Sequence, residues 1–238
     1  MLNKLLLSTA ILCVSATAGL AQGFSGAEIG IEYSDLTDLE DFSGTNYYGS
    51  AEFDIMQGVA VAGDFAIYDF ELGDADISNF TLHGIYNLNP TTSLGLFFGQ
   101  DNVDDSTVDN IGFEAAYNFG YGTAQGYIGQ GDDGSDQVTY IGAAGDYGLG
   151  SGFSVTAAFD SADLDDATIS KFEFGGEYAL PAGVKFSAAI GNLSLDDSGV
   201  DVDENYFSIG ASIGLGPKNG TTFNRRSFFE ANSIGVDS

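Results

Sequence analysis

Acidic side chains recur two or four positions apart in several ten-residue segments, among residues that are otherwise apolar or small. Carboxylates at such spacing could act as general acids and bases, hold a metal ion, or line a watery passage for cations. Two lysines and the single histidine share these segments. The candidate set comprises Glu28, Glu32, Glu52, Asp54, Asp64, His83, Glu114, Lys171, Glu173, Glu177 and Lys185.

The other residues of these segments predict the elements that position the carboxylates. In residues 168–179, Phe172 and Phe174 fall on one face of an extended chain and Lys171 and Glu173 on the other. A two-residue period is typical of a β-strand whose faces meet different surroundings. The predicted strands lie near residues 24–33, 45–55, 58–68, 77–87, 92–100, 109–119, 121–130, 137–147, 152–160, 168–179, 183–193 and 205–215.

The connections between these segments are of two kinds. Even-numbered segments are followed by short pieces rich in Gly and Pro, such as MQG, NPTT and GYG. Odd-numbered segments are followed by longer acidic pieces, such as DLTDLEDFSG, DNVDDST and SLDDSGVDVDE, and these hold most of the acidic residues. An up-and-down barrel puts all odd connections at one rim, whereas Greek-key crossings mix them. We therefore predict an all-β, up-and-down antiparallel barrel of about 12 strands.

Alternation alone does not say which face is inside. A soluble barrel with an apolar pocket would carry its charges outside, whereas a membrane barrel turns apolar side chains to lipid and polar ones to the lumen. In residues 109–119, Ile111 and Phe113 oppose Glu114, and every other charged segment divides in the same way. The segregated acidic loops and the N-terminal leader favour the membrane barrel, with short periplasmic turns and longer acidic outer loops.

Residues 1–21 have the features of a cleaved secretory signal peptide. Lys4 precedes the apolar stretch LLLSTAILCVSA, and small residues follow it. Cys13 is the only cysteine, so removal of the signal leaves a chain without thiolate chemistry or disulfides. The formal net charge of −29 makes nucleic acid an improbable partner.

The leader, the twelve alternating segments, the aromatic residues near segment ends, such as Tyr86, Tyr117 and Tyr147, and the acidic connections together resemble a small Gram-negative outer-membrane porin. The resemblance covers residues 22–216 and is one of pattern. It implies insertion by the outer-membrane assembly machinery, contact with outer-membrane lipid, and passive diffusion of small hydrophilic solutes. The chain departs from the family pattern because it ends in Ser238 rather than an aromatic residue, and because DNVDDST is too short to fold inward as a constricting loop.

The excess of carboxylates on the inward face predicts a lumen that prefers cations. Twelve strands lie between small filled barrels and open sixteen-strand porins. Two interpretations follow: a water-filled, cation-preferring channel, or a non-conducting barrel whose acidic loops hold divalent cations or mediate surface interactions.

Loosely bound Ca²⁺ is the one cofactor that the acidic outer loops suggest. The pieces DDGSDQ and DDSGVDVDE cluster carboxylates beside a flexible Gly, although neither reproduces a complete Ca²⁺ loop. The candidate ligands are Asp132, Asp133, Asp136, Asp196, Asp197, Asp201 and Asp203. We favour a solvated acidic rim over a defined metal site.

His83 raises the question of catalysis, since some outer-membrane barrels are hydrolases, including a twelve-stranded phospholipase that uses a His and a Ser. A catalytic base needs a nucleophile within hydrogen-bond reach and a third group that orients it. The alternation sends His83 inward with Thr81, and no Ser motif identifies a partner. We therefore expect a hydrogen-bonding residue of the lumen and no enzyme.

Residues 217–238 form a tail that is rich in basic and aromatic residues. After an even number of strands the tail leaves the barrel on the short-turn, periplasmic side. One hypothesis is that Arg225 and Arg226 enter the acidic lumen as a plug. The interpretation that we favour is a periplasmic extension or a closure segment containing Phe223, Phe228 and Phe229.

Overall fold

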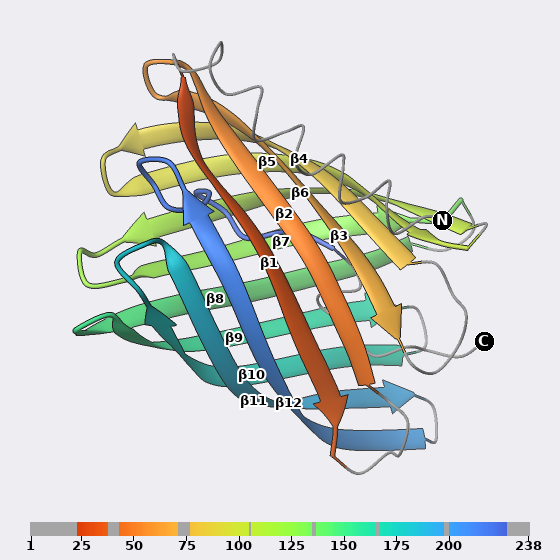
Figure 1. Ribbon diagram of the computed structural model, residues 1–238. Helices are drawn as coiled ribbons and strands as arrows, with labels where there is room; N and C mark the ends of the chain where they lie inside the picture. Colours follow the sequence, from red (N-terminus) through yellow and green to blue (C-terminus); the bar gives the residue numbers. More distant parts are fainter. Residues whose placement is uncertain are drawn as a thin grey trace, which may run out of the picture.

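The computed structural model describes residues 23–37, 43–70, 77–104, 106–134, 137–164, 167–197 and 200–227. These residues form one closed barrel of antiparallel strands (Figure 1). The predicted signal peptide, residues 1–21, lies outside the described residues. Across the described ranges, no helix is long and apolar enough to cross a membrane.

Twelve strands make up the barrel, as the alternation predicts. They are β1 (Phe24–Leu36), β2 (Ser43–Met56), β3 (Val59–Phe70), β4 (Ile77–Asn89), β5 (Thr92–Val103), β6 (Ser106–Asn118), β7 (Thr123–Asp132), β8 (Gln137–Gly150), β9 (Phe153–Leu164), β10 (Ala167–Ala179), β11 (Val184–Asp197) and β12 (Val200–Leu215).

Each strand pairs with its neighbours in sequence, and β1 pairs with β12 to close the barrel. This arrangement confirms the predicted up-and-down topology. Following the registered partners once around the barrel gives a cumulative shift of about 14 residues, a strand tilt of about 40° and a backbone radius of about 12 Å. A barrel of this radius has room inside for more than its own side chains.

Several strands are longer than predicted at the acidic rim. Sequence DNVDDST was expected to be a loop, but β5 continues to Val103 and β6 begins at Ser106. The same happens between β9 and β10 and between β11 and β12. The ladder of backbone hydrogen bonds can continue beyond the apolar belt into water, and polarity therefore marks the end of that belt and not the end of the strand.

The outward face of the barrel is apolar. Phe113 and Ile190 are 66% and 67% exposed, and the side chains beside them on the same face are exposed as well. This exposed belt includes Ile29, Ile31, Val61, Phe65, Phe80, Leu82, Phe98, Ile111, Ile128, Ile141, Phe172, Phe174, Phe186 and Ile209. An exposed belt of this extent is characteristic of a surface that meets lipid. The inside and outside faces are therefore as predicted.

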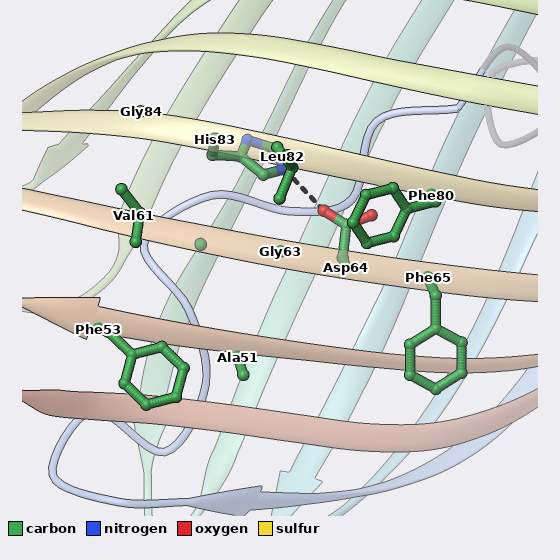
Figure 2. Close-up of a pocket in the computed structure, with 11 residues that line it drawn as sticks. Ala51, Phe53, Val61, Gly63, Asp64, Phe65, Phe80, Leu82, His83 and Gly84 are labelled. Carbon is green, nitrogen blue, oxygen red and sulfur yellow. Dashed lines mark hydrogen bonds and ion pairs between the residues drawn. The ribbon is translucent and has the colours of Figure 1, made fainter. Parts of the chain in front are cut away.

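One shallow groove interrupts the belt over β2, β3 and β4 (Figure 2). Its volume is about 650 Å³. Ala51, Gly63 and Gly84 form its floor because their side chains are small or absent, and Phe53, Val61, Phe65, Phe80 and Leu82 stand around them. The groove is lined almost entirely by apolar surface and faces the same way as the belt.

The chain turns back into the barrel after β12, at the end coloured dark blue in Figure 1. Gly216 makes this reversal with φ of 76°, a conformation that glycine adopts readily. The Lys218 N–H then donates to the Ser25 carbonyl oxygen (3.0 Å), and Gly220 lies so close to Gly26 that no Cβ would fit between them. Residues 217–227, which we call the lumen segment, continue inside the barrel along the wall formed by β2 to β7.

This position differs from the periplasmic extension that the sequence analysis favoured. The lumen segment lies where the alternative hypothesis, the plug, would put it. The physical reason is that carboxylates on β2 and β6 are removed from water and need donors close by, which a tail outside the barrel could not supply. Phe228 and Phe229 lie outside the described residues.

Candidate functional site in the barrel lumen

Glu52 on β2 holds the first part of the lumen segment. Its side chain is fully buried and accepts hydrogen bonds from Lys218 Nζ at one oxygen and from the Thr222 N–H at the other, the latter at 2.6 Å. A buried carboxylate is stable only when both of its oxygens are satisfied. Glu52 therefore fixes the segment by one side chain and one backbone group.

Phe223 is the apolar anchor of the segment. The ring is 3% exposed and packs in a cluster with Ala60, Ala62 and Ile85, which are inward residues of β3 and β4. It also lies nearly parallel to the His83 ring, with 6.3 Å between centroids and 18° between planes. Small residues on the wall make room for this ring.

His83 bridges two buried carboxylates. Its Nε2 atom lies 2.6 Å from Asp64 Oδ2, and its Nδ1 atom lies 2.6 Å from Glu114 Oε1. Figure 2 shows His83 of β4 turned toward Asp64 of β3. Each of these contacts needs a proton, whereas a neutral imidazole carries a single N–H. The three side chains therefore hold at least two protons between them.

Arg226 lies beside this triad. Its Nε atom forms an ion pair with Glu114 Oε2 at 3.1 Å, and Nη2 donates to Gln125 Oε1 at 2.9 Å. The guanidinium group also lies over the Tyr127 ring, 4.4 Å from its centroid. Arg225 lies over the Tyr48 ring at 3.6 Å. Both arginines thus contact tyrosine faces, which attract planar cations.

The last described residues end in a buried polar cluster. The Arg226 carbonyl oxygen accepts a hydrogen bond from Thr81 Oγ1 (2.7 Å), and Ser227 Oγ donates to Asp101 Oδ1 (2.6 Å). Asp101 is fully buried and also accepts from Asn79 Nδ2 and Asn110 Nδ2. The predicted outer loop at Asp101 is wrong, because β5 continues past it to Val103.

The opposite wall, which we call the uncovered wall, carries ionisable side chains that the lumen segment leaves partly exposed, including Glu28 beside Gly220. Lys185 Nζ lies 2.7 Å from Glu28 Oε2 and 3.9 Å from Glu177 Oε2, and all three side chains keep between 20% and 28% of their surface exposed. Tyr206 O–H donates to Glu173 Oε2 at 3.0 Å, and Lys171 Nζ lies 5.3 Å from the centroid of the Tyr206 ring. These groups, on β1 and β10 to β12, face the interior and are half-buried.

The predicted lumen residues therefore divide between two walls. Glu52, Asp64, His83 and Glu114 lie together under the lumen segment, and each is at most 4% exposed. Half-buried residues of the other wall are Glu28, Glu32, Lys171, Glu173, Glu177 and Lys185. Asp54 lies apart from both groups, exposed at the short-turn rim, where its N–H donates to the Gly23 carbonyl oxygen.

The candidate Ca²⁺ ligands lie at the acidic rim. Asp132 accepts hydrogen bonds from the Gly134 N–H (2.7 Å) and from Gln137 Nε2 (3.1 Å), so both of its oxygens have protein donors. Asp133, Asp196, Asp197 and Asp203 are exposed, and Asp136 and the Asp201 side chain lie outside the description. Among the described residues, no group of three or more His, Cys, Asp or Glu is placed to hold a metal ion. The Ca²⁺ rim stays a prediction.

Several site residues were absent from the sequence analysis. Tyr127 O–H donates to Asp160 Oδ1 at 2.6 Å, and Gln125 accepts from both Arg226 and the Asn224 N–H. Alternation within β7 and β9 places Gln125, Tyr127 and Asp160 on the inward face and could have included them. Gln125 and Tyr127 carry no charge, and Asp160 stands at the last position of its predicted strand, next to an acidic connection.

A scan against protein-family models finds no match, and a search of curated proteins finds none. Solved outer-membrane porins share the fold. The KdgM porin superposes with a TM-score of 0.59 at 8% sequence identity, covering 78% of this chain and 98% of the porin. The NanC porin gives 0.56 at 12% identity, covering 79% and 100%. An outer-membrane channel from Pseudomonas putida F1 gives 0.56 at 14% identity, covering 80% and 96%. The predicted porin-like barrel is thus confirmed as a fold.

Proposed function

We propose that the protein is an outer-membrane channel for the passive diffusion of small hydrophilic solutes, with a preference for cations. The observation that carries this proposal is the row of half-buried acidic side chains on β1 and β8 to β10, inside a closed barrel whose outer face is apolar. Such an interior offers a polar surface that lipid cannot reach.

The path for solutes lies between the lumen segment and the uncovered wall. The barrel has a backbone radius of about 12 Å, and the segment fills the side next to β2 to β7. Side chains of the uncovered wall, such as Asp146, Asp160 and Glu177, are only half-buried. This leaves a passage suited to small solutes and too narrow for large ones.

Charge gives the passage its preference. The uncovered wall carries the carboxylates Glu28, Glu32, Asp146, Asp160, Glu173 and Glu177 against the amines Lys171 and Lys185, and Arg225 of the lumen segment adds one more cation beside Tyr48. A cleft lined by one sign of charge between walls of low dielectric focuses the field and concentrates counter-ions. The mechanism is therefore diffusion through a negatively lined lumen, with no covalent step.

A solved porin of the same fold offers a contrast in solute class. The KdgM porin has also been solved in complex with disordered oligogalacturonate, an acidic sugar chain. This chain shares that fold, but its uncovered wall has a surplus of carboxylates, which would repel a polyanion. We infer that it passes a different class of solute, neutral or positively charged.

Catalysis is not part of the proposal. Both ring nitrogens of His83 face carboxylates, at 2.6 Å each, so neither is available to a hydroxyl nucleophile. A base in a hydrolase needs that position for its Ser. Insertion by the outer-membrane assembly machinery, contact with outer-membrane lipid and loose Ca²⁺ binding at the rim belong to the same proposal.

A non-conducting barrel is the second candidate, and the lumen segment favours it. Phe223 is packed and almost completely buried, and Arg226 is 4% exposed, as in a filled interior. In this case the acidic rim would interact with divalent cations or with other surface molecules. The two candidates differ in whether ions cross the folded protein.

The test is a planar bilayer containing the refolded full-length protein under a KCl gradient, repeated with CaCl₂. A reversal potential of the sign for K⁺ permeation supports the cation-preferring channel. Absence of current from protein shown to be folded, by heat-modifiable migration and by β-type circular dichroism, contradicts it and supports the filled barrel. A current without cation preference supports a channel but contradicts the proposed selection by lumen charge.

A further inference from the structure

Residues of the barrel wall contact the guanidinium group of Arg226 both at its edge and on its face. The barrel supplies a carboxylate oxygen 3.1 Å from Nε (Glu114, an ion pair without hydrogen-bond geometry), an amide oxygen that accepts from Nη2 (Gln125, 2.9 Å) and a ring beneath the guanidinium group (Tyr127, 4.4 Å). Arg226 Nη1 donates to the Arg225 carbonyl oxygen at 3.0 Å. Such a set of partners fits a planar group that has several donors in one plane.

The site belongs to the barrel wall and its occupant belongs to the lumen segment. Glu114 lies on β6, and Gln125 and Tyr127 lie on β7, so the paired strands hold all three in register. Arg226 reaches them at the end of a segment of backbone without regular strand structure. Tethering of this kind keeps the occupant at a high effective concentration.

We propose that Glu114, Gln125 and Tyr127 form a guanidinium-binding site, that Arg226 is its tethered ligand, and that a soluble alkylguanidinium cation occupies the site when the Arg226 side chain is removed. The ligand class is a small cation with a planar guanidinium group, such as free arginine. The proposal depends on the lumen geometry and holds whether or not the barrel conducts ions.

The second basic contact of the lumen segment is of a different kind and supplies a matched control. Lys218 Nζ contacts oxygens of Glu52 and Thr222, and within the described part of the chain no aromatic ring lies under it. An ammonium group is a compact point charge with freely rotating donors. The Lys218 site should therefore show no preference for a planar cation over an ammonium of the same size.

The experiment is chemical rescue of Arg226→Ala in the full-length protein. The variant is expected to unfold at a lower urea concentration than the wild type. Millimolar ethylguanidinium is expected to recover about half of this shift, and the recovery should rise with the logarithm of its concentration, as ligand binding to the folded state requires. Ethylammonium at the same ionic strength should recover little. Lys218→Ala should respond equally to the two cations.

Two outcomes would overturn the proposal: no recovery by ethylguanidinium at any millimolar concentration, or equal recovery of Arg226→Ala by both cations. If Arg226→Ala does not fold alone, the yield of heat-modifiable protein refolded with each cation is the readout, with the same expectations. The double variant Arg226→Ala/Gln125→Ala removes the amide oxygen of the site. Ethylguanidinium should recover less than half as much there, and undiminished recovery would exclude the assigned site.

Discussion

The double variant Glu173→Gln/Glu177→Gln should reduce cation preference strongly. Each side chain reaches from a wall at a radius of about 12 Å to within about 6 Å of a permeating ion. A unit charge at that distance in water is worth about 0.7 kcal/mol, and screening at 0.1 M salt reduces this to about 0.4 kcal/mol. Two charges act oppositely on cations and anions, so the cation-to-anion permeability ratio should fall about tenfold.

The assay is the reversal potential in a planar bilayer under a KCl gradient, measured at two mean salt concentrations. At 1 M salt the Debye length is about 3 Å, and the same variant should change the permeability ratio only about twofold. This salt dependence separates a field effect on the ions from a change of pore shape, which would persist at high salt.

The matched control is Asp64→Asn, which removes one carboxylate from the covered wall. Asp64 is 4% exposed and is bonded to His83, and it lies on the wall that the lumen segment covers. The permeability ratio should change about twofold or less. If Asp64→Asn changed the ratio more than the double variant does, the passage would not lie along the uncovered wall and the reasoning would be refuted.

Three further predictions concern the lumen segment and the lipid belt. Ending the chain after Gly216 should raise single-channel conductance; unchanged conductance in folded protein would mean that the segment does not narrow the path. Gly95→Val should lower the free energy of unfolding by about 1–3 kcal/mol, because a Cβ at this position would lie 2.7 Å from both Phe223 and Glu114. Urea titration measures this free energy, and an unchanged value would contradict the packing of Phe223 against this wall. Phe113→Arg should cost about 2–4 kcal/mol against about 0–1 kcal/mol for Tyr117→Arg on the same face near the rim; equal costs in vesicle unfolding assays would argue against lipid at Phe113.

The barrel could be predicted from the sequence because its cause is local. An alternating pattern indicates the two faces of a strand, as with Phe172 and Phe174 on one face and Lys171 and Glu173 on the other. Each strand shows such a pattern independently of the others. The regular alternation of short turns and longer acidic connections indicates that each strand pairs with its neighbour in sequence. Strand ends were less predictable, because hydrogen bonding at the acidic rim continues past the apolar belt, as at Asp101.

The inward position of Glu52, Asp64, His83 and Glu114 also followed from alternation. Their grouping under one segment did not, because it depends on which residues meet across strands and on what enters the barrel. His83 is 19 residues from Asp64 and 31 from Glu114 in the chain. Only the strand register brings them within hydrogen-bond reach.

The sequence by itself determined the number of strands, their order and the inward face of Glu52, Asp64 and Glu114, since these depend on neighbours along the chain. The tertiary structure alone decided where residues 217–227 lie and which carboxylates remain facing the passage. Those outcomes depend on closure of β1 against β12, which creates an interior where buried acids on β2 and β6 need cations. Lys218 and Arg226 supply them from a tail that no local pattern directs inward.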